Sequence, residues 1–420
     1  MTGPAPAGPG AGELRSFRAL RVVELGTWIA APVASALLAD LGADVVKVEP
    51  PAGDPARRWF AAMGVADGDD EVQPTFALDN RRKRSIELDL TDPTARAELD
   101  GLLGEADVMV TNMRPGRAGE LGLGPAELVE AHPRLVVATV TAAGSRGKEA
   151  DERGYDVGHF WARSGLAHQL GVTAPLHAPG GYGDHVTGLA LFAAILAGLH
   201  ERQVTGRGGV VETSLLRVGS WVASPDLAVL GTLGRVRAVP AREAAPTPLV
   251  NSYRTADDRW FFLTCIEAMR HLARVCEAVD RPELLADPRF ADARSLNRHR
   301  RELIAELDAA FAAEPLSYWA ERFRTTGVWW QRVQTPAEVL VDDQLVEDGA
   351  LEPVDVGGGT TVPMLTSPVS VFGHREPGTA RAPALDDYRT TQSSRPTAAT
   401  PPQQDDPLWS TVAPTRRQAP

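Results

Sequence analysis

The chain has 420 residues, of which 43% are hydrophobic and 23% are charged, and its net charge is -12. This length predicts two globular domains, and the acidic balance argues against a general nucleic-acid binder. The two cysteines, Cys265 and Cys276, exclude a disulfide framework and a cysteine metal cluster. We find no signal-peptide pattern, and the longest apolar run, at 189–199, is too short to cross a bilayer. We therefore expect a cytoplasmic protein with no membrane or nucleic-acid partner.

The first fifty residues predict a β–α–β unit. Residues 20–25 are typical of a buried strand, 32–41 of a helix and 44–49 of a second strand. Parallel strands joined by a helix are typical of a Rossmann-like sheet. The turn that follows residue 25 lacks the G-x-G-x-x-G fingerprint of dinucleotide binding. The sequence therefore predicts a Rossmann-like sheet that serves neither a nicotinamide nor a flavin.

Strands and helices continue to alternate up to about residue 220. Strands are predicted at 85–90, 107–112 and 135–140, and helices at 94–103, 125–131 and 189–199. This alternation predicts an α/β fold, with a large Rossmann-like domain over residues 13–220. The preceding residues 1–12 are Pro, Gly and Ala in the main and predict a disordered leader.

Beyond residue 220 the pattern changes. Residues 232–249 are typical of a linker, 251–254 and 259–264 of a hairpin, and 267–278 and 297–313 of helices. We predict a smaller α+β domain over 225–325 and a segment over 326–375 that returns to the large domain. Residues 376–420 are rich in Pro, Thr, Ser and Gln, which predicts a disordered tail.

A run of four basic residues, Arg81 to Arg84, lies directly before the strand predicted at 85–90, and Arg57 lies in an earlier loop. Arginine clusters suit phosphate groups, although such a run is more often a solvated turn. Asn112 and Met113 lie at the end of another predicted strand. Ligands of open parallel sheets bind beyond these carboxyl ends. Both groups are therefore candidates for binding a phosphate-bearing ligand.

Asp184 lies between a glycine-rich turn and the apolar run at 189–199. Glycines at such a place let a substrate approach the backbone closely. A carboxylate at a helix N-terminus is stabilised as the anion by free N–H groups, so we expect Asp184 to be ionised at neutral pH. On local pattern alone, an aspartate that merely caps the helix is the more common explanation.

Several segments occur in the order typical of one family. The sequence resembles the class III CoA-transferases, which include formyl-CoA transferase, carnitine CoA-transferase and α-methylacyl-CoA racemase. The resemblance covers roughly residues 18–372, and its segments are Asp44-Val45-Val46-Lys47-Val48-Glu49, Gly53-Asp54, Lys83-Arg84-Ser85-Ile86-Glu87, Asn112 with Pro115-Gly116, Gly154-Tyr155-Asp156, Gly183-Asp184 and Thr205-Gly206-Arg207-Gly208.

The resemblance implies that Asp184 is a catalytic nucleophile. Its carboxylate would attack an acyl-CoA thioester to form a mixed anhydride, and the released thiolate would convert this to an aspartyl-CoA thioester. The acceptor acid would then reverse the steps. Backbone N–H groups beside Gly183 would stabilise the oxyanions. Acyl-CoA and carboxylic acids are then substrates, with no metal and no tightly bound cofactor expected.

The resemblance also implies a CoA site. Arg84 matches the basic residue of the family's CoA site that precedes the Ser-Ile-Glu-Leu strand, and Asn112 and Met113 match the strand-end pair that lines the CoA channel. Arg57, Arg81 and Arg82 are proposed for the CoA phosphates on charge alone. Departures at Thr27, Ile29 and Glu120, and at 385–388, argue against formyl and oxalyl substrates.

Two alternatives remain at this point. A racemase or an intramolecular isomerase needs a second acid or base, but the sequence has Tyr155-Asp156 where the racemase has a His-Asp pair, and tyrosine is a poor base near neutral pH. A non-catalytic acyl-CoA-binding relative is the other alternative, and the retained Asp184 argues against it. The family resemblance further implies an interlocked homodimer.

Overall fold

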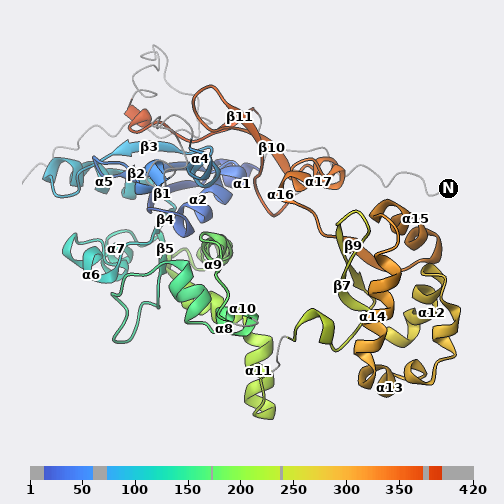
Figure 1. Cartoon of the computed structure of the whole chain (residues 1–420). Helices are drawn as coiled ribbons and strands as arrows, with labels where there is room; N and C mark the ends of the chain where they lie inside the picture. Colours follow the sequence, from blue (N-terminus) through green and yellow to red (C-terminus); the bar gives the residue numbers. More distant parts are fainter. Residues whose placement is uncertain (1–13, 60–72, 172–173, 237–239, 372–377, 390–420) are drawn as a thin grey trace, which may run out of the picture. The chain divides into compact units, whose positions relative to one another are not determined.

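The computed structural model describes residues 14–59, 73–171, 174–236, 240–371 and 378–389. The predicted leader and most of the predicted tail lie outside these residues. The chain divides into two compact units. The large unit comprises the chain up to His168, His177–Thr232 and the chain from Asp343, and the small unit comprises Gln169–Leu176 and Leu233–Asp342. Each unit is described separately below (Figure 1).

The large unit is built on one six-stranded sheet in which every pairing is parallel. Its order, β3-β2-β1-β4-β5-β6, is the order of the Rossmann fold. The sequence prediction of a Rossmann-like sheet is thus confirmed. The order reverses between β1 and β4, so ligands are expected at the carboxyl ends of these two strands. The strands are β1 (Arg21–Leu25), β2 (Asp44–Glu49), β3 (Arg84–Glu87), β4 (Val108–Thr111), β5 (Val136–Thr141) and β6 (Gly209–Ser214).

Successive residues of each strand point to opposite faces of the sheet, and both faces carry apolar side chains. Helices therefore cover both faces. Val22, Val45 and Val136 face a core with α2 (Ala30–Asp40) and α9 (Tyr182–Thr205). The next residues along, such as Val23 and Val137, face a second core with α5 (Pro93–Glu105) and α7 (Pro125–Ala131). Shorter helices of this unit are α1 (Arg15–Arg18), α4 (Pro74–Asn80), α6 (Pro115–Glu120), α8 (Leu166–Leu170), α10 (Leu215–Val222), α11 (Ser224–Leu233) and α17 (Asp343–Asp348).

Helix α9 is longer than the apolar run predicted at 189–199, and its length and composition alone would suffice to cross a membrane. Its packing explains the apolar composition, because Leu191, Phe192 and Ile195 are buried in the core shared with α2. The two helices approach closely at Gly188. A Cβ at this position would lie 2.7 Å from the Val33 Cβ and 2.8 Å from the Ala30 carbonyl oxygen. Glycine at 188 therefore sets the distance between α2 and α9.

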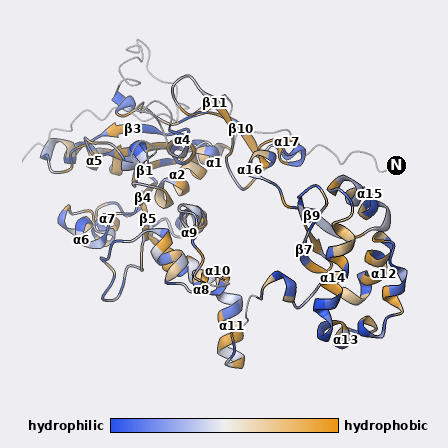
Figure 2. Cartoon of the chain, in the orientation of Figure 1, coloured by the Kyte–Doolittle hydropathy of each residue, from blue (hydrophilic) through white to orange (hydrophobic). Residues whose placement is uncertain are grey.

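The small unit joins an antiparallel sheet to a helical layer. Strands β7 (Val250–Arg254), β8 (Trp260–Thr264) and β9 (Trp330–Arg332) pair in the order β7-β8-β9. Buried aromatic rings such as Phe261, Phe311 and Phe323 form its core, and its strands and helices carry hydrophobic residues where they meet (Figure 2). Its helices are α12 (Ala268–Ala278), α13 (Ala293–Arg298), α14 (Arg300–Phe311), α15 (Leu316–Thr326) and α16 (Pro336–Val339).

The predicted domain boundaries differ from the observed division. We predicted a return to the large domain at 326, whereas the structure assigns residues to the small unit up to Asp342. The reason is β9, which pairs with β8 and packs Trp330 against Phe261 and Phe323. A three-residue strand is too short for its partner to be recognised from sequence pattern.

The prediction of a disordered tail from residue 376 is wrong for 378–389. Strand β12 (Ala380–Arg381) joins β10 (Leu351–Asp355), which pairs with β11 (Thr361–Leu365). Asp387 and Asp386 then accept hydrogen bonds from the amides of Ser85 and Glu87 at 2.8 and 3.1 Å. These two amides lie along the free edge of β3, so the segment covers a sheet edge that would otherwise be unpaired.

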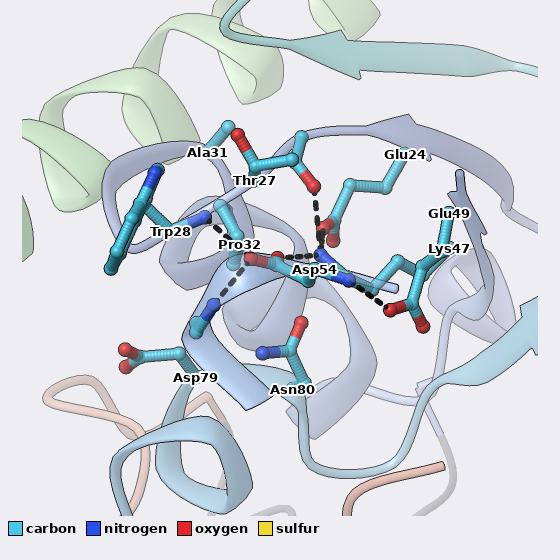
Figure 3. Close-up of polar contacts among 12 residues, drawn as sticks. Glu24, Thr27, Trp28, Ala31, Pro32, Lys47, Glu49, Asp54, Asp79 and Asn80 are labelled. Carbon is cyan, nitrogen blue, oxygen red and sulfur yellow. Dashed lines mark hydrogen bonds and ion pairs between the residues drawn. The ribbon is translucent and has the colours of Figure 1, made fainter. Parts of the chain in front are cut away.

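A buried ionic network lies below the carboxyl ends of β1 and β2 (Figure 3). The ammonium group of Lys47 contacts Glu24 Oε1 at 2.7 Å, Asp54 Oδ2 at 2.8 Å and the Gly26 carbonyl at 2.8 Å. Lys83 contacts the other oxygen of Glu24 at 2.6 Å. All four charged side chains are fully or almost fully buried.

The network also reaches helices α2 and α4. Lys83 donates to the carbonyl oxygens of Pro32 in α2 and of Asp79 in α4, at 2.9 and 2.8 Å. Burial lowers the pKa of Lys83 to about 8, against the opposing charge of Glu24. Burial alone would lower the pKa of Lys47 as well, but Glu24 and Asp54 outweigh it and raise that pKa. The ion pairs therefore keep Lys47 charged inside the protein.

We predict that Gly188→Ala lowers the free energy of unfolding by about 1–3 kcal/mol, because the added methyl group must push α9 away from α2. Chemical denaturation would measure this change. Gly101→Ala in α5 is the control, since nothing lies within 4 Å of its added Cβ. The control should be neutral or more stable by about 0.5–1 kcal/mol. Equal effects of the two substitutions would contradict the close α2–α9 contact.

We predict that Lys47→Met lowers the free energy of unfolding by about 3–5 kcal/mol, because it leaves Glu24 and Asp54 buried beside each other without their shared cation. Thermal and denaturant unfolding would report the loss. Arg117→Met, which breaks an exposed pair with Glu120, should change stability by no more than about 0.5 kcal/mol. A Lys47 variant as stable as this control would show that the network is dispensable.

Candidate active site

Asp184 is the third residue of helix α9, and it does not cap that helix. The N-cap is Gly181, whose φ of 91° is a left-handed conformation that favours glycine. Asp184 is partly exposed, and no hydrogen bond or ion pair joins its carboxylate to any residue in the described part of the chain. The explanation of Asp184 as a simple capping residue is therefore wrong for this structure.

A different carboxylate occupies the start of α9. One oxygen of Asp156, Oδ2, accepts hydrogen bonds from the amides of Gly181 and Gly183 at 2.8 and 3.1 Å. Asp156 is only 3% exposed. The expectation that amides beside Gly183 stabilise reaction oxyanions therefore fails for the Gly183 N–H itself, because Asp156 already binds it. Asp156 belongs to the Gly154-Tyr155-Asp156 segment of the resemblance, but its contact with α9 could not be read from sequence.

The electrostatics of Asp184 differ from those expected of a helix N-terminus. Burial, followed by the negative charges of Asp156 and Asp79, raises the pKa of Asp184 to about 7, and His185 offsets only part of this rise. We expected free N–H groups to hold Asp184 as the anion. Asp156 takes two of these groups, and burial together with the charges of Asp156 and Asp79 gives Asp184 a pKa near neutrality.

His185, the next residue along α9, pairs with Asp79. Its Nε2 lies 3.2 Å from Asp79 Oδ1, and the Asp79 side chain is 5% exposed. Burial alone would lower the pKa of His185, but the hydrogen bond and charge of Asp79 raise it. Figure 3 shows Asp79 at the end of α4, pointing away from the Lys47 network. No sequence signal links Asp79 to the site, since it lies in a short helix far from α9 in the chain.

The backbone before α9 is held by close packing. Asp156 directly precedes a π-helical turn, η2 (Val157–Ala162), a distortion common at functional sites. Phe160 of this turn is buried, and a Cβ at Gly183 would lie 2.6 Å from its ring. A Cβ at Gly219 in α10 would lie 2.3 Å from the Phe160 carbonyl oxygen. Because Gly183 and Gly219 carry no side chain, Phe160 packs directly on their backbone. This contact holds η2, and the preceding Asp156, against α9.

Asn112 joins the two loops at the point where the strand order reverses. Its side-chain amide donates to the Thr27 carbonyl at 2.7 Å and accepts from the Thr27 N–H at 3.1 Å. It therefore holds the loop after β1 rather than pointing freely to a ligand. Met113 follows it and packs at the edge of the core below the sheet. Both residues lie at the carboxyl end of β4, as predicted.

Arg84 lies away from this point, on the edge strand β3. Its guanidinium pairs with Asp44 and lies over the ring of Tyr388, with Cζ 4.8 Å from the ring centre. Its side chain is 28% exposed. Arg84 keeps an accessible surface for an anion, but the structure brings it together with neither Asn112 nor Asp184.

The three arginines proposed on charge alone all have acidic partners. Arg81 is 3% exposed and binds Asp40, with Nε 3.0 Å from Oδ1. Arg82 binds Glu352 at 2.9 Å. The guanidinium of Arg57 donates two hydrogen bonds to the carboxylate of Glu49, at 2.8 and 2.6 Å. These partners count against the three residues as phosphate ligands, and most strongly against the buried Arg81.

Sequence reasoning also missed an aromatic cluster. Trp28 lies in the loop after β1 with a φ of 64°, and Asp54 accepts a hydrogen bond from its N–H at 3.1 Å. Its ring meets those of Trp59 and Tyr155 edge to face, at centroid distances of 5.3 and 5.9 Å. Trp59 and Tyr155 are 43% and 65% exposed. Since Tyr155 adjoins Asp156, this cluster lies beside the start of α9.

No group of three or more His, Cys, Asp or Glu side chains within the described ranges is arranged to hold a metal ion. The chemistry available at the start of α9 is that of carboxylates, one histidine and exposed aromatic rings. A carboxylate with a raised pKa and no hydrogen bond is suited to nucleophilic or acid–base chemistry.

Comparison with known proteins gives the family. A family profile described as CoA-transferase family III matches residues 18–388. The chain is 29% identical over 353 residues to (R)-2-hydroxy-4-methylpentanoate CoA-transferase of Clostridioides difficile, which covers 83% of this chain and 88% of that protein. It is 33% identical over 337 residues to succinyl-CoA–D-citramalate CoA-transferase of Chloroflexus aurantiacus, covering 78% and 80%.

Among solved structures, the fold is similar to that of a CaiB/BaiF family protein from Brucella suis. The TM-score is 0.78 at 26% identity, with 89% of this chain and 97% of that chain covered. The family resemblance drawn from the sequence is thus confirmed. The profile match, the curated relatives and the common fold show that the chain belongs to CoA-transferase family III and is an acyl-CoA:carboxylate CoA-transferase.

Proposed function

We propose that the protein moves CoA from an acyl-CoA to a carboxylic acid with Asp184 as the covalent nucleophile. One observation carries this proposal. Asp184 is a partly exposed carboxylate at the end of a core helix, with no hydrogen bond to a described residue and with a pKa raised to about 7. Such a group is available to a substrate and is more basic than an ordinary aspartate.

The steps balance without a cofactor. An oxygen of Asp184 bonds to the acyl carbon, the C–S bond breaks, and CoA leaves as the thiolate with the bonding electrons. The thiolate then attacks the Asp184 side-chain carbonyl carbon, and the donor acid leaves as a carboxylate. The acceptor carboxylate reverses both steps on the aspartyl-CoA thioester. The energy of the thioester is conserved throughout, so no nucleotide hydrolysis is required.

The names of the relatives suggest which acids to test as acceptors. The names of several relatives, such as (R)-2-hydroxy-4-methylpentanoate, phenyllactate and D-citramalate CoA-transferases, refer to 2-hydroxy acids. Others refer to dicarboxylic acids such as glutarate. An acceptor panel should therefore contain 2-hydroxy acids with apolar side chains, dicarboxylic acids and oxalate.

We predict that hydroxylamine added to the enzyme with a suitable acyl-CoA converts Asp184 to a hydroxamate, because both the anhydride and the thioester react with amines. Peptide mass spectrometry would locate the adduct. Asp184→Asn should give no adduct and lower kcat by about 10⁴-fold or more. Asp100→Asn, at an exposed carboxylate of α5, is the control and should behave as the wild type.

Three results would contradict the proposal. Full transfer activity in Asp184→Asn would remove Asp184 from the mechanism. Exchange of the substrate α-proton with solvent deuterium, without CoA transfer to any acid, would instead favour a racemase. Binding of acyl-CoA with neither reaction would favour a non-catalytic protein.

We further propose that the protein is a homodimer. Helix α11 has no buried residue, and Leu227 and Leu230 are exposed on it, while Trp221 of the preceding helix is 73% exposed. Apolar side chains that gather on a surface commonly mark a protein interface.

We predict that light scattering after size exclusion gives twice the chain mass of 44.9 kDa for the wild type. Replacement of the exposed apolar pair, Leu227→Glu with Leu230→Glu, should shift the protein towards the monomer, because charges are poorly tolerated in an interface core. Thr232→Glu on the same helix is the control. A monomeric wild-type protein would refute the dimer.

A further inference from the structure

We propose that Asp156 is the positioning residue of the nucleophile: it occupies the amide donors at the start of α9 and so keeps the Asp184 carboxylate free of backbone hydrogen bonds and beside a like charge. This inference rests on the proposed role of Asp184. It assigns Asp156 no contact with the substrate. Asp156 acts through Asp184 alone.

The geometry of the helix start supports this assignment. The first amides of a helix lack partners within the helix and attract any nearby carboxylate. Two carboxylates are available here, Asp156 and Asp184. Asp156 Oδ2 binds both Gly181 N–H and Gly183 N–H, at 2.8 and 3.1 Å. Asp184, only one residue beyond Gly183, is left without a hydrogen bond to any residue the structure describes.

Which of the two carboxylates binds the helix amides affects the rate at which Asp184 attacks the acyl carbon. When Asp184 bonds to the acyl carbon, the negative charge on its oxygen disappears. Hydrogen bonds to that oxygen would stabilise the free carboxylate more than the transition state and would therefore raise the barrier. If Asp156 were absent, Asp184 would be the carboxylate nearest to the free amides. Asp156 thus prevents the helix from stabilising its own nucleophile.

The charges around Asp184 also support a positioning role for Asp156. Three titratable side chains act on it: Asp156 before η2, Asp79 from α4, and His185 on α9 itself. The charge of Asp79 is matched by His185 at 3.2 Å, which in turn is near Arg81. Asp156 has amide partners but no cation, because no ion pair involves it within the described ranges. Its repulsion of Asp184 is accordingly uncompensated, and after burial it is the largest cause of the raised pKa of Asp184.

Packing of the turn that follows Asp156 also fixes the position of this residue. It is 3% exposed and directly precedes η2, whose Phe160 packs against the bare backbone of Gly183 and Gly219. A shift of Asp156 away from α9 would require η2 to move as well. The packing of η2 therefore holds Asp156 at the amides at the start of α9.

The test is the pH profile of kcat/KM for CoA transfer in Asp156→Asn, because this ratio reports the pKa values of the free enzyme. Asparagine keeps the shape and one acceptor oxygen but removes the charge. In the wild type we expect activity to fall as the pH drops through about 7, where Asp184 gains its proton. In the variant this acidic limb should move down by about one pH unit, because a like charge is removed. The plateau kcat should fall about threefold to tenfold with the lower basicity of Asp184, and KM for acyl-CoA should change less than about twofold.

Two further variants separate positioning from mere helix capping. Asp156→Glu restores the charge and should return the acidic limb towards the wild-type position. Asp156→Ser is a neutral cap, and it should show the same downward shift if Asp156→Asn fails to fold. Asp92→Asn, at the N-cap of α5, removes a capping carboxylate remote from α9 and should leave the profile unchanged.

Defined results would overturn the proposal. If both neutral variants keep the wild-type acidic limb, or lose activity only in proportion to the folded fraction measured by circular dichroism, Asp156 is a helix cap alone. The hydroxylamine experiment separates this failure from that of the proposed function. A wild-type adduct at Asp184 with an unshifted profile refutes only the role of Asp156, whereas absence of the wild-type adduct refutes both.

Discussion

The large unit depends on the burial of charge below the carboxyl ends of β1 and β2. Glu24 lies between two ammonium groups, and Lys47 lies between two carboxylates, all removed from water. Such charges are tolerated only while each has its partners, so the network requires one arrangement of the segments that supply them. Those segments include the loop after β1 and the end of α4. The first presents Trp28, and the second presents Asp79 to His185.

The start of α9 then combines two carboxylates with opposite properties. Asp156 is buried, hydrogen-bonded and fixed by the packing of η2, whereas Asp184 has no hydrogen bond in the described structure and titrates near neutrality. The environment thus gives two identical side chains different hydrogen bonding and different exposure. The pairing of Asp79 with His185 places a compensated charge nearby. In the mechanism proposed above, the chain makes an ordinary aspartate reactive by controlling which carboxylate reaches the helix amides.

Much of the fold could be predicted from the sequence, because strand and helix periods are local. The predicted strand at 44–49 and the predicted helix at 125–131 coincide with β2 and α7. Asp184 was found through the family resemblance, since its local pattern alone favoured a helix cap. Partners distant in sequence could not be predicted. Arg82 meets Glu352 across 270 positions, and Asp156 meets Gly183 across 27, so neither the pairing of the basic run nor the cap of α9 leaves a local signal.

The segment that covers β3 has a consequence for synthesis of the chain. Asp386 and Asp387 bind the edge amides of a strand formed about three hundred residues earlier. Until the ribosome has made nearly the whole described chain, that edge has no cover and can pair with a strand of another nascent molecule. All six strands of this sheet have been made by Ser214, but its β3 edge is covered only once Asp386 and Asp387 follow, so we expect chains truncated before these residues to aggregate more readily.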